Sequence, residues 1–195
     1  MTFLERVLQF DRDLFFVINV KWSNHVFDLI LPYMREANTW IPFYLFLLIY
    51  MPIRHKKRAW FWIFLAIVTV AITDPVSSRL IKDHIFRVRP CGDKSLAAHI
   101  HVLVHYCPQS SSFTSSHAAN HFGFSTFIYA TLKSYYGKAV GFIFLWAFVV
   151  CYAQVYVGVH FPLDIIGGAI VGVIIGYIMA RIFNKYSKLE KQRIN

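Results

Sequence analysis

The sequence predicts an all-α membrane protein: a polytopic helical bundle with five to six transmembrane helices and an N-terminal amphipathic helix. Hydrophobic residues make up 57% of the 195 residues and charged residues only 15%, whereas a soluble domain carries about 25% charged residues. The apolar residues collect in runs of the kind that cross a bilayer. Aromatic residues reach 18%, which suits the belts at membrane surfaces. These observations disfavour the alternative of a soluble protein with an unusually apolar core.

The N-terminal segment, residues 1–22, is expected to lie in the membrane interface. Between Phe3 and Val20, apolar side chains recur at roughly helical spacing against charged neighbours, a pattern typical of an interfacial amphipathic helix. The same charged residues, with no long apolar core, argue against a cleavable signal peptide. A short apolar stretch, Phe27 to Tyr33, leaves a sixth membrane span open in this region.

Five apolar runs follow, and each is expected to be a transmembrane helix. They are Trp40–Ile53, Ala59–Ile72 (continuing toward Ile81), Ala118–Leu132, Ala139–Val159 and Leu163–Phe183. A chain of this length normally makes one domain, so residues 1–195 are expected to form a single unit. Its two polar parts are the loop 82–117, rich in His, Pro, Ser and Gly, and the basic tail 184–195.

Lysines and arginines set the expected orientation, because cytoplasmic loops carry more of them. The richer side holds Arg54, Lys56, Lys57, Arg58, Lys133, Lys138, Arg181, Lys185, Lys188, Lys191 and Arg193. The poorer side holds mainly Lys82, Arg87, Arg89 and Lys94. Loop 82–117 is therefore expected to face the periplasm or exterior of a bacterial inner membrane. This topology explains the net charge of +10 better than nucleic-acid binding does.

The cysteines agree with an outward loop. Cys91 and Cys107 share loop 82–117, and Cys151 lies within a predicted span. In an oxidising compartment, a disulfide between Cys91 and Cys107 would stabilise the loop by about 3 kcal/mol; two free thiols are the alternative. The loop histidines have no distinctive metal-ligand spacing, which favours contact with solvent or a substrate headgroup; they are His84, His99, His101 and His105.

Three polar clusters stand at the outward ends of the predicted spans. The first, Lys82 to Pro90, holds two arginines and a lysine, which match phosphate oxygens, although cations there can also snorkel to headgroups. The second, Phe113 to His117, precedes an apolar helix. Ser or Thr at such a place is an N-cap by default, and a helix start also receives anions.

The third cluster, Gly158 to Asp164, opens the last span. His160 and Asp164 lie four residues apart, so the carboxylate can orient the imidazole as it would for a base or nucleophile. Pro162 suits the first turn of a helix. An acidic residue at a helix start is also favoured by the helix dipole alone, so the cluster does not by itself require chemistry.

Together, Lys82-x6-Arg89-Pro90, Ser115-x-His117 and His160-x3-Asp164 resemble the three signature motifs of the type 2 phosphatidic acid phosphatase superfamily. The resemblance covers about Ser23 to Phe183. It implies a membrane enzyme that needs no metal or cofactor and hydrolyses a phosphomonoester or diphosphate of a lipid. The substrates it implies are a polyprenyl diphosphate such as undecaprenyl diphosphate, phosphatidylglycerophosphate, phosphatidic acid or a lipid A phosphate.

The resemblance also implies roles for the motif residues. His160 would attack phosphorus to give a phosphohistidine, while Asp164 holds its ring. His117 would protonate the leaving oxygen and then help water to release the phosphate. The groups that would hold the phosphate oxygens are Lys82, Arg89, Ser115 and the backbone N–H of Ser116.

Two positions depart from the family pattern. Ser116 stands where the second motif usually has glycine, and Ala153-Gln154 stands where the third motif usually opens with Ser-Arg. Gln154 can donate hydrogen bonds to the substrate but carries no charge. Arg87 and Arg79 are the candidates to replace the missing arginine. The departure keeps two alternatives open: a non-catalytic lipid-phosphate binder or transporter, and a lipid phosphotransferase. The sequence does not indicate an oligomeric state.

Overall fold

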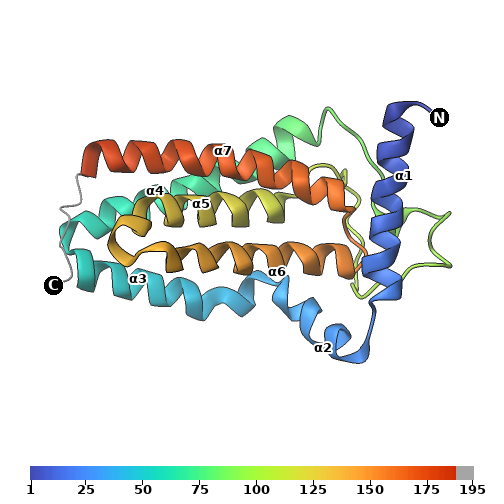
Figure 1. Cartoon of the computed structure of the whole chain (residues 1–195), viewed down its shortest axis with the longest axis horizontal. Coiled ribbons are helices and arrows are strands. Elements are labelled where there is room, and N and C mark those ends of the chain that lie inside the picture. Colours follow the sequence, from blue (N-terminus) through green and yellow to red (C-terminus); the bar gives the residue numbers. More distant parts are fainter. Residues whose placement is uncertain (188–195) are drawn as a thin grey trace.

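A computed structural model describes residues 1–187, and within them every regular element is a helix. Five helices run side by side along the long axis of the molecule (Figure 1). They are α3 (Ile41–His55), α4 (Lys57–Pro75), α5 (Ser116–Tyr136), α6 (Ile143–Tyr156) and α7 (Pro162–Ser187). Helix α5 packs against α4, α6 and α7 and so forms the centre of the bundle. The predicted all-α membrane bundle is confirmed.

Helix α1 (Phe3–Phe16) lies across one end of the bundle (Figure 1). Thr2 and Glu5 form a capping box that fixes its start. Asp11 and Phe15 are buried against the bundle, while Phe3 and Phe10 on the other side are exposed. An outward apolar face on a helix at this position suits the predicted interfacial location. A short helical turn, η1 (Val17–Lys21), then leads to α2 (His25–Met34) after a bend of 115°.

The protein is a multi-pass membrane protein. Among the described residues, three helical stretches are long and apolar enough to cross a membrane: Lys57–Ile81, Lys138–Tyr156 and Pro162–Ser187. The number of candidate spans rises to four if α1 with η1 and the following α2 together form one span that is broken at the bend between them. Helix α3 has only 15 residues, and α5 carries several polar side chains. The count of five to six spans therefore stays a prediction.

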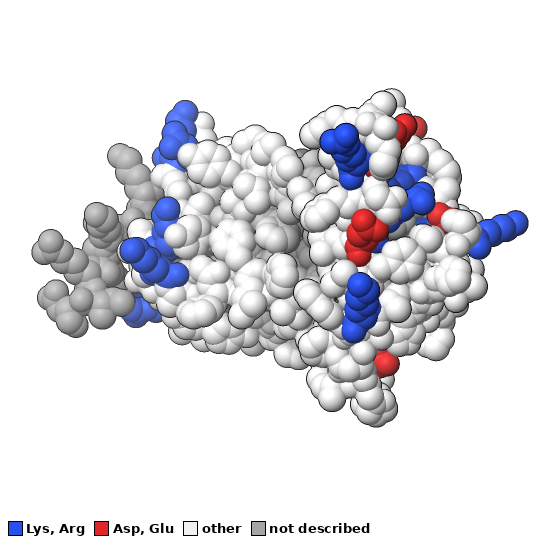
Figure 2. Space-filling view, turned by 45° about the vertical axis from the view of Figure 1, so that its right-hand side comes forward, with Lys and Arg blue, Asp and Glu red and all other residues white. Residues whose placement is uncertain are grey.

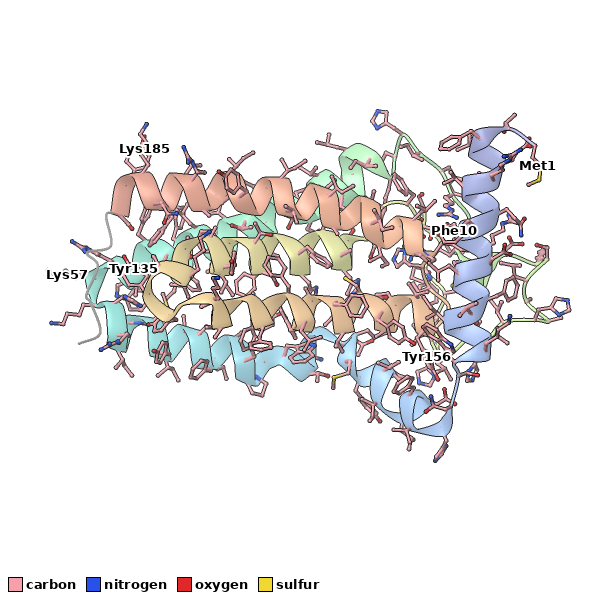
Figure 3. All side chains as sticks on the ribbon, in the orientation of Figure 1. Met1, Phe10, Lys57, Tyr135, Tyr156 and Lys185 are labelled. Carbon is pink, nitrogen blue, oxygen red and sulfur yellow. A yellow bond between two sulfur atoms is a disulfide. The ribbon has the colours of Figure 1, made fainter. Side chains whose placement is uncertain are left out.

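Charged side chains gather at the two ends of the molecule. Between them, the face seen in Figure 2 shows a broad belt without charged side chains. Lys57 and Lys185 lie at one end, and Phe10 and Tyr156 at the other (Figure 3). The predicted tail 184–195 begins inside α7, which continues to Ser187; residues 188–195, with Lys188, Lys191 and Arg193, lie outside the described residues.

Three glycines of α7 let it approach α5 backbone to backbone. A Cβ atom at Gly168, Gly172 or Gly176 would overlap a carbonyl oxygen of α5 or of its N-cap; these oxygens belong to Ser115, Ala119 and Gly123. Small residues at such spacing allow close helix packing in membranes. As a result the starts of α5 and α7 lie together, and the Ser115 N–H donates to the Asp164 carbonyl oxygen over 2.9 Å.

This contact gives a stability prediction. In Gly172→Ala, the new methyl group meets the backbone oxygen of Ala119, which cannot rotate away. Overpacking of this kind costs about 1–3 kcal/mol, so we expect the Tm of the detergent-solubilised protein to fall by at least about 3 °C. Gly141→Ala is the control, because the nearest atom to its Cβ, on Tyr129, is 3.7 Å away. Equal Tm values for the two variants would contradict the packing argument.

Candidate active site

His160 lies in the tight turn between α6 and α7, with its side chain almost completely buried. The N–H groups of Val159 and His160 both donate to the Gln154 carbonyl oxygen, which fixes the turn. The ring presents Nε2 to Arg89 Nη1 at 3.0 Å and Nδ1 to the Asp164 carboxylate at 3.4 Å. A guanidinium can only donate, so Nε2 accepts and the ring proton sits on Nδ1. His160 therefore offers an unprotonated Nε2 beside a cation.

The environment keeps this ring neutral at ordinary pH. Burial lowers the pKa of His160 to about 4 and outweighs the hydrogen bond and charge of Asp164, which act in the opposite direction. The nearby positive charges of Arg89 and Lys82 lower the pKa further. A neutral imidazole is the form that can act as a nucleophile.

Asp164 in the first turn of α7 is fully buried and fully hydrogen-bonded. Its carboxylate accepts from the Ser112 hydroxyl (2.5 Å) and from the Phe161 N–H (2.8 Å). Arg87 Nη1 donates to its other oxygen over 2.7 Å. Ser112 was missed in the sequence, because nothing in its serine run, Ser110 to Ser112, distinguishes one position from another.

Arg87 joins α7 to the N-terminal helix. Its second amino group, Nη2, lies 2.5 Å from the carboxylate of Asp11. Asp11 also accepts from the Leu163 N–H at the start of α7 (2.8 Å). Arg87 is thus occupied by two carboxylates, and the suggestion that it replaces the missing arginine of the third motif is wrong; Arg79 is exposed on η3 (Val76–Ile81). Asp11 was missed because a charge on an amphipathic helix usually faces solvent.

Arg89 is buried and held in place by residues 110–111 of loop 82–117. Its Nε donates to the Ser110 carbonyl oxygen (3.0 Å) and its Nη2 to the Ser111 carbonyl oxygen (3.2 Å). These bonds leave Nη1 at the His160 ring. Lys82 follows η3, and burial together with the charge of Arg89 lowers the pKa of Lys82 to about 8, although Asp74 and Asp164 raise it. The positive charges of Lys82 and Arg89 thus act on each other here, an arrangement that favours the binding of an anion.

The second motif supplies the start of α5. Ser115 is the N-cap and its hydroxyl accepts from the Ala118 N–H over 3.3 Å. The Ser116 hydroxyl lies 3.3 Å from that of Ser77. The N–H groups of the first helical turn, at Ser116 and His117, have no acceptor within the helix and can receive an anion.

His117 belongs to the same end of the molecule as His160. Its ring stacks parallel to that of His121, which in turn packs on Trp146 with ring centroids 4.7 Å apart. Burial lowers the pKa of His117 to about 3, and the charges of neighbouring basic groups, among them Arg35 and Lys82, act in the same direction, so a bound anion beside the ring is needed to protonate it at ordinary pH. The Ser115 N–H donates to the Asp164 carbonyl oxygen, which places the start of α5, with His117, beside the start of α7. The structure therefore brings all three sequence clusters together.

A cavity of about 770 Å³ opens beside His117. Its wall is mostly apolar and comes from α3, α4, α5 and α6; the lining includes Ile41, Leu45, Leu48, Ile67, Phe124 and Trp146. The polar groups on the wall lie next to the second motif: Ser116, His117, Asn120, His121 and Asp74. The Asn120 amide donates to Asp74 (3.2 Å). This shape can take an apolar chain whose polar end lies at His117; His160 is not part of the cavity wall.

Gln154 on α6 is completely buried. Its Oε1 accepts from Arg35 Nε over 3.3 Å, and its Nε2 has no partner among the described residues. Arg35, which follows α2, was missed because it lies far from every motif in the sequence. The family pattern has an arginine at position 154. Here that position is a glutamine, and Arg35 from another part of the chain is hydrogen-bonded to it.

Loop 82–117 is also closed by a covalent bond. Cys91 and Cys107 form a disulfide, with Cα atoms 5.9 Å apart, and the Cys91 N–H donates to the Gly158 carbonyl oxygen (2.9 Å). Cys151 is buried and unpaired. Residues 1–187 contain no group of three or more His, Cys, Asp or Glu side chains placed to hold a metal.

Two curated proteins are similar to this chain in sequence. A lipid A 4'-phosphatase of Bacteroides thetaiotaomicron is 29% identical over 148 residues, or 75% of this chain and 65% of that protein. A lipid A 4'-phosphatase of Porphyromonas gingivalis is 27% identical over 185 residues, or 92% of this chain and 75% of that protein. The chain thus spans less than two thirds of the Bacteroides protein.

Two solved structures are similar in fold. The crystal structure of Aquifex aeolicus LpxE has 26% sequence identity and a TM-score of 0.60, covering 87% of this chain and 93% of that chain. A transmembrane PAP2-type phosphatidylglycerolphosphate phosphatase from Bacillus subtilis has 21% identity and a TM-score of 0.66, covering 96% and 90%. Residues 61–188, which hold all three motifs, match the sequence model of the PAP2 superfamily. The chain belongs to this superfamily.

Proposed function

We propose that this protein is a lipid phosphatase that hydrolyses a phosphate ester of a membrane lipid through a phosphohistidine at His160. The observation that carries the proposal is the position of the His160 ring between Asp164 and Arg89. A phosphate oxygen bound by Arg89 would place phosphorus next to the unprotonated Nε2. Phosphoryl transfer depends mainly on positioning and charge stabilisation, and this arrangement supplies both.

The proposed first step transfers the phosphoryl group to the enzyme. Nε2 of His160 attacks phosphorus, the bond to the lipid oxygen breaks, and His117 gives that oxygen its proton. Asp164 stabilises the positive charge that the ring gains. In the second step His117 takes a proton from water, the water oxygen attacks phosphorus, and the P–N bond breaks. Inorganic phosphate leaves, and both histidines return to their starting protonation states.

The cations and helix start would bind the phosphate oxygens throughout. Arg89 and Lys82 supply the charge, and the Ser116 N–H donates from the positive end of α5. Ser115, whose hydroxyl caps the helix, would hold this turn in place and contact the phosphate. These groups supply the charge stabilisation that a metal gives in other phosphatases.

A lipid A phosphate is the substrate that we propose first, because both curated relatives are named as lipid A 4'-phosphatases. The apolar cavity beside His117 supports a lipid, since an acyl chain would fit it while the phosphate stays at the histidines. The charge distribution supports a site that faces the periplasm from the inner membrane, because Lys57 and Lys185 lie at the opposite end.

The function is tested by phosphate release from a panel of lipids. We expect the purified protein to release inorganic phosphate from a lipid A phosphate, with polyprenyl diphosphate, phosphatidylglycerophosphate and phosphatidic acid as comparison substrates. His160→Ala removes the nucleophile and His117→Ala the proton donor, so each should lower turnover at least about 100-fold. His84→Ala is the control, because His84 is exposed and bonds only within its own turn.

Two results would contradict this mechanism. Full turnover in both histidine variants would remove the two-histidine chemistry. Lipid binding without any phosphate release by the wild-type protein would favour the non-catalytic binder. A radiolabelled phosphoryl group trapped on the wild-type protein, but not on His160→Ala, would identify the intermediate directly.

The low pKa of Lys82 predicts the alkaline side of the pH profile. With a pKa of about 8, Lys82 loses its charge as the pH rises, so kcat/KM should fall above about pH 8 through weaker phosphate binding. His160 stays neutral across this range, because its pKa is about 4. Lys82→Arg keeps its charge, and its alkaline limb should move up by at least about one pH unit. An unmoved limb would exclude Lys82 as its source.

Activity is also expected to be independent of divalent metals. The proposed phosphate-binding groups are cationic side chains, a serine hydroxyl and backbone N–H groups of the chain itself, so removal of metal leaves them in place. Prolonged treatment with EDTA, followed by assay in metal-free buffer, should change kcat by less than about two-fold. Loss of activity with EDTA and its recovery with a specific metal would contradict this part of the proposal.

A further inference from the structure

Arg35 approaches the site from the N-terminal region. It follows α2, its side chain is 17% exposed, and its Nε donates to Gln154 Oε1 over 3.3 Å. Its one ion pair, from Nη1 to Glu36 at 3.4 Å, involves a carboxylate that is itself 58% exposed. A contact of that kind contributes little and is easily exchanged. The guanidinium therefore keeps donors for another partner.

Three observations place Arg35 near the proposed reacting groups. Gln154, its partner, also accepts the N–H of His160 at its carbonyl oxygen. Ala37, two residues after Arg35, lines the same cavity as Ser116 and His117. Burial lowers the pKa of Arg89, and the negative charge of Asp164 raises it. The positive charge of Arg35 also lowers the pKa of Arg89. Arg35 and Arg89 therefore lie near the same site.

Gln154 carries a donor that nothing in the described chain accepts. Its Nε2 is buried and has no hydrogen-bond partner, a condition that costs free energy unless a ligand or water relieves it. The Oε1 of the same amide is used by Arg35. A phosphate oxygen that accepts from Arg35 would lie close to this amide and could also accept from Nε2.

We propose that Arg35 binds a phosphate oxygen of the substrate in place of the arginine that the third motif lacks, and that Gln154 positions Arg35 through Oε1 and donates from Nε2 to the same phosphate. This inference rests on the proposed function and names a further residue of the same site. The neighbouring cations are already assigned: Arg87 pairs with two carboxylates, and Arg89 is held at His160. Arg35 is the arginine that reaches Gln154.

The decisive variant is Arg35→Gln. A hydrogen bond to a charged group is worth about 10- to 100-fold in binding, so we expect KM for the lipid phosphate to rise by about that factor. The inhibition constant of inorganic phosphate should rise in parallel, because phosphate offers the same oxygens. Arg12→Gln is the control: Arg12 is an exposed arginine on α1 at the same end of the molecule, and both constants should stay within about two-fold of wild type.

The relocated arginine offers a second comparison. In the double variant Arg35→Gln/Gln154→Arg, the charge returns to the position of the family motif, and we expect at least about five-fold recovery of KM relative to Arg35→Gln. If Arg35→Gln does not fold, the same two constants are measured for Arg35→Lys instead. Lysine keeps the charge but lacks the planar fork, so KM and the phosphate inhibition constant should both rise about 10-fold.

The possible failures are distinguishable. If the wild-type protein releases phosphate and Arg35→Gln leaves KM and the phosphate inhibition constant unchanged, Arg35 is not a phosphate ligand. A fall in kcat alone, with a lower Tm and unchanged constants, would show a structural role and also overturn the inference. If the wild-type protein releases no phosphate from any lipid, it is the proposed function that fails.

Discussion

The buried carboxylate of Asp164 is the point on which the site depends. A carboxylate without water is tolerated only when charges and hydrogen bonds compensate it. Here Arg87, the Ser112 hydroxyl and the Phe161 N–H do so, and the His160 ring lies against the same group. These partners come from two parts of the chain: Arg87 and Ser112 from loop 82–117, and His160 and Phe161 from the turn before α7. Satisfying one carboxylate therefore requires loop 82–117 and the turn that carries His160 to be in place together.

Arg87 extends this constraint to the N-terminus. Because its two amino groups bind Asp164 and Asp11, α1 is fixed across the end of the bundle and covers the start of α7. The glycines of α7 act from the other side: they hold the start of α5 within hydrogen-bond distance of Asp164. The two histidines are thus placed by backbone packing between α5 and α7 and by an ion-pair network at the end of the bundle.

The fold and the motif residues could largely be predicted from the sequence, because both leave local signals. Apolar runs identified the helices: the predicted spans begin at Ala118 and Leu163, close to the observed starts of α5 at Ser116 and α7 at Pro162. The partners of the motifs could not be predicted. Asp11, Ser112 and Arg35 become part of the site only through contacts across at least 50 residues of sequence. Asp11 shows why: on an amphipathic helix, its position alone cannot distinguish a buried acid from a solvated one.

The third motif illustrates the same limit at the level of mechanism. A phosphate oxygen responds to a charge at a position in space, and the residue number that supplies the charge is irrelevant to it. An arginine at position 154 would be buried against Arg35, and two desolvated guanidinium groups at that distance repel strongly. The neutral amide avoids this repulsion and accepts from Arg35 instead. An arginine at position 35 is therefore compatible with a glutamine at position 154, whereas arginines at both positions would repel each other. If Arg35, which follows α2, holds the phosphate as proposed, a neutral residue at position 154 fits the site. Gln154 in the motif therefore does not argue against catalysis.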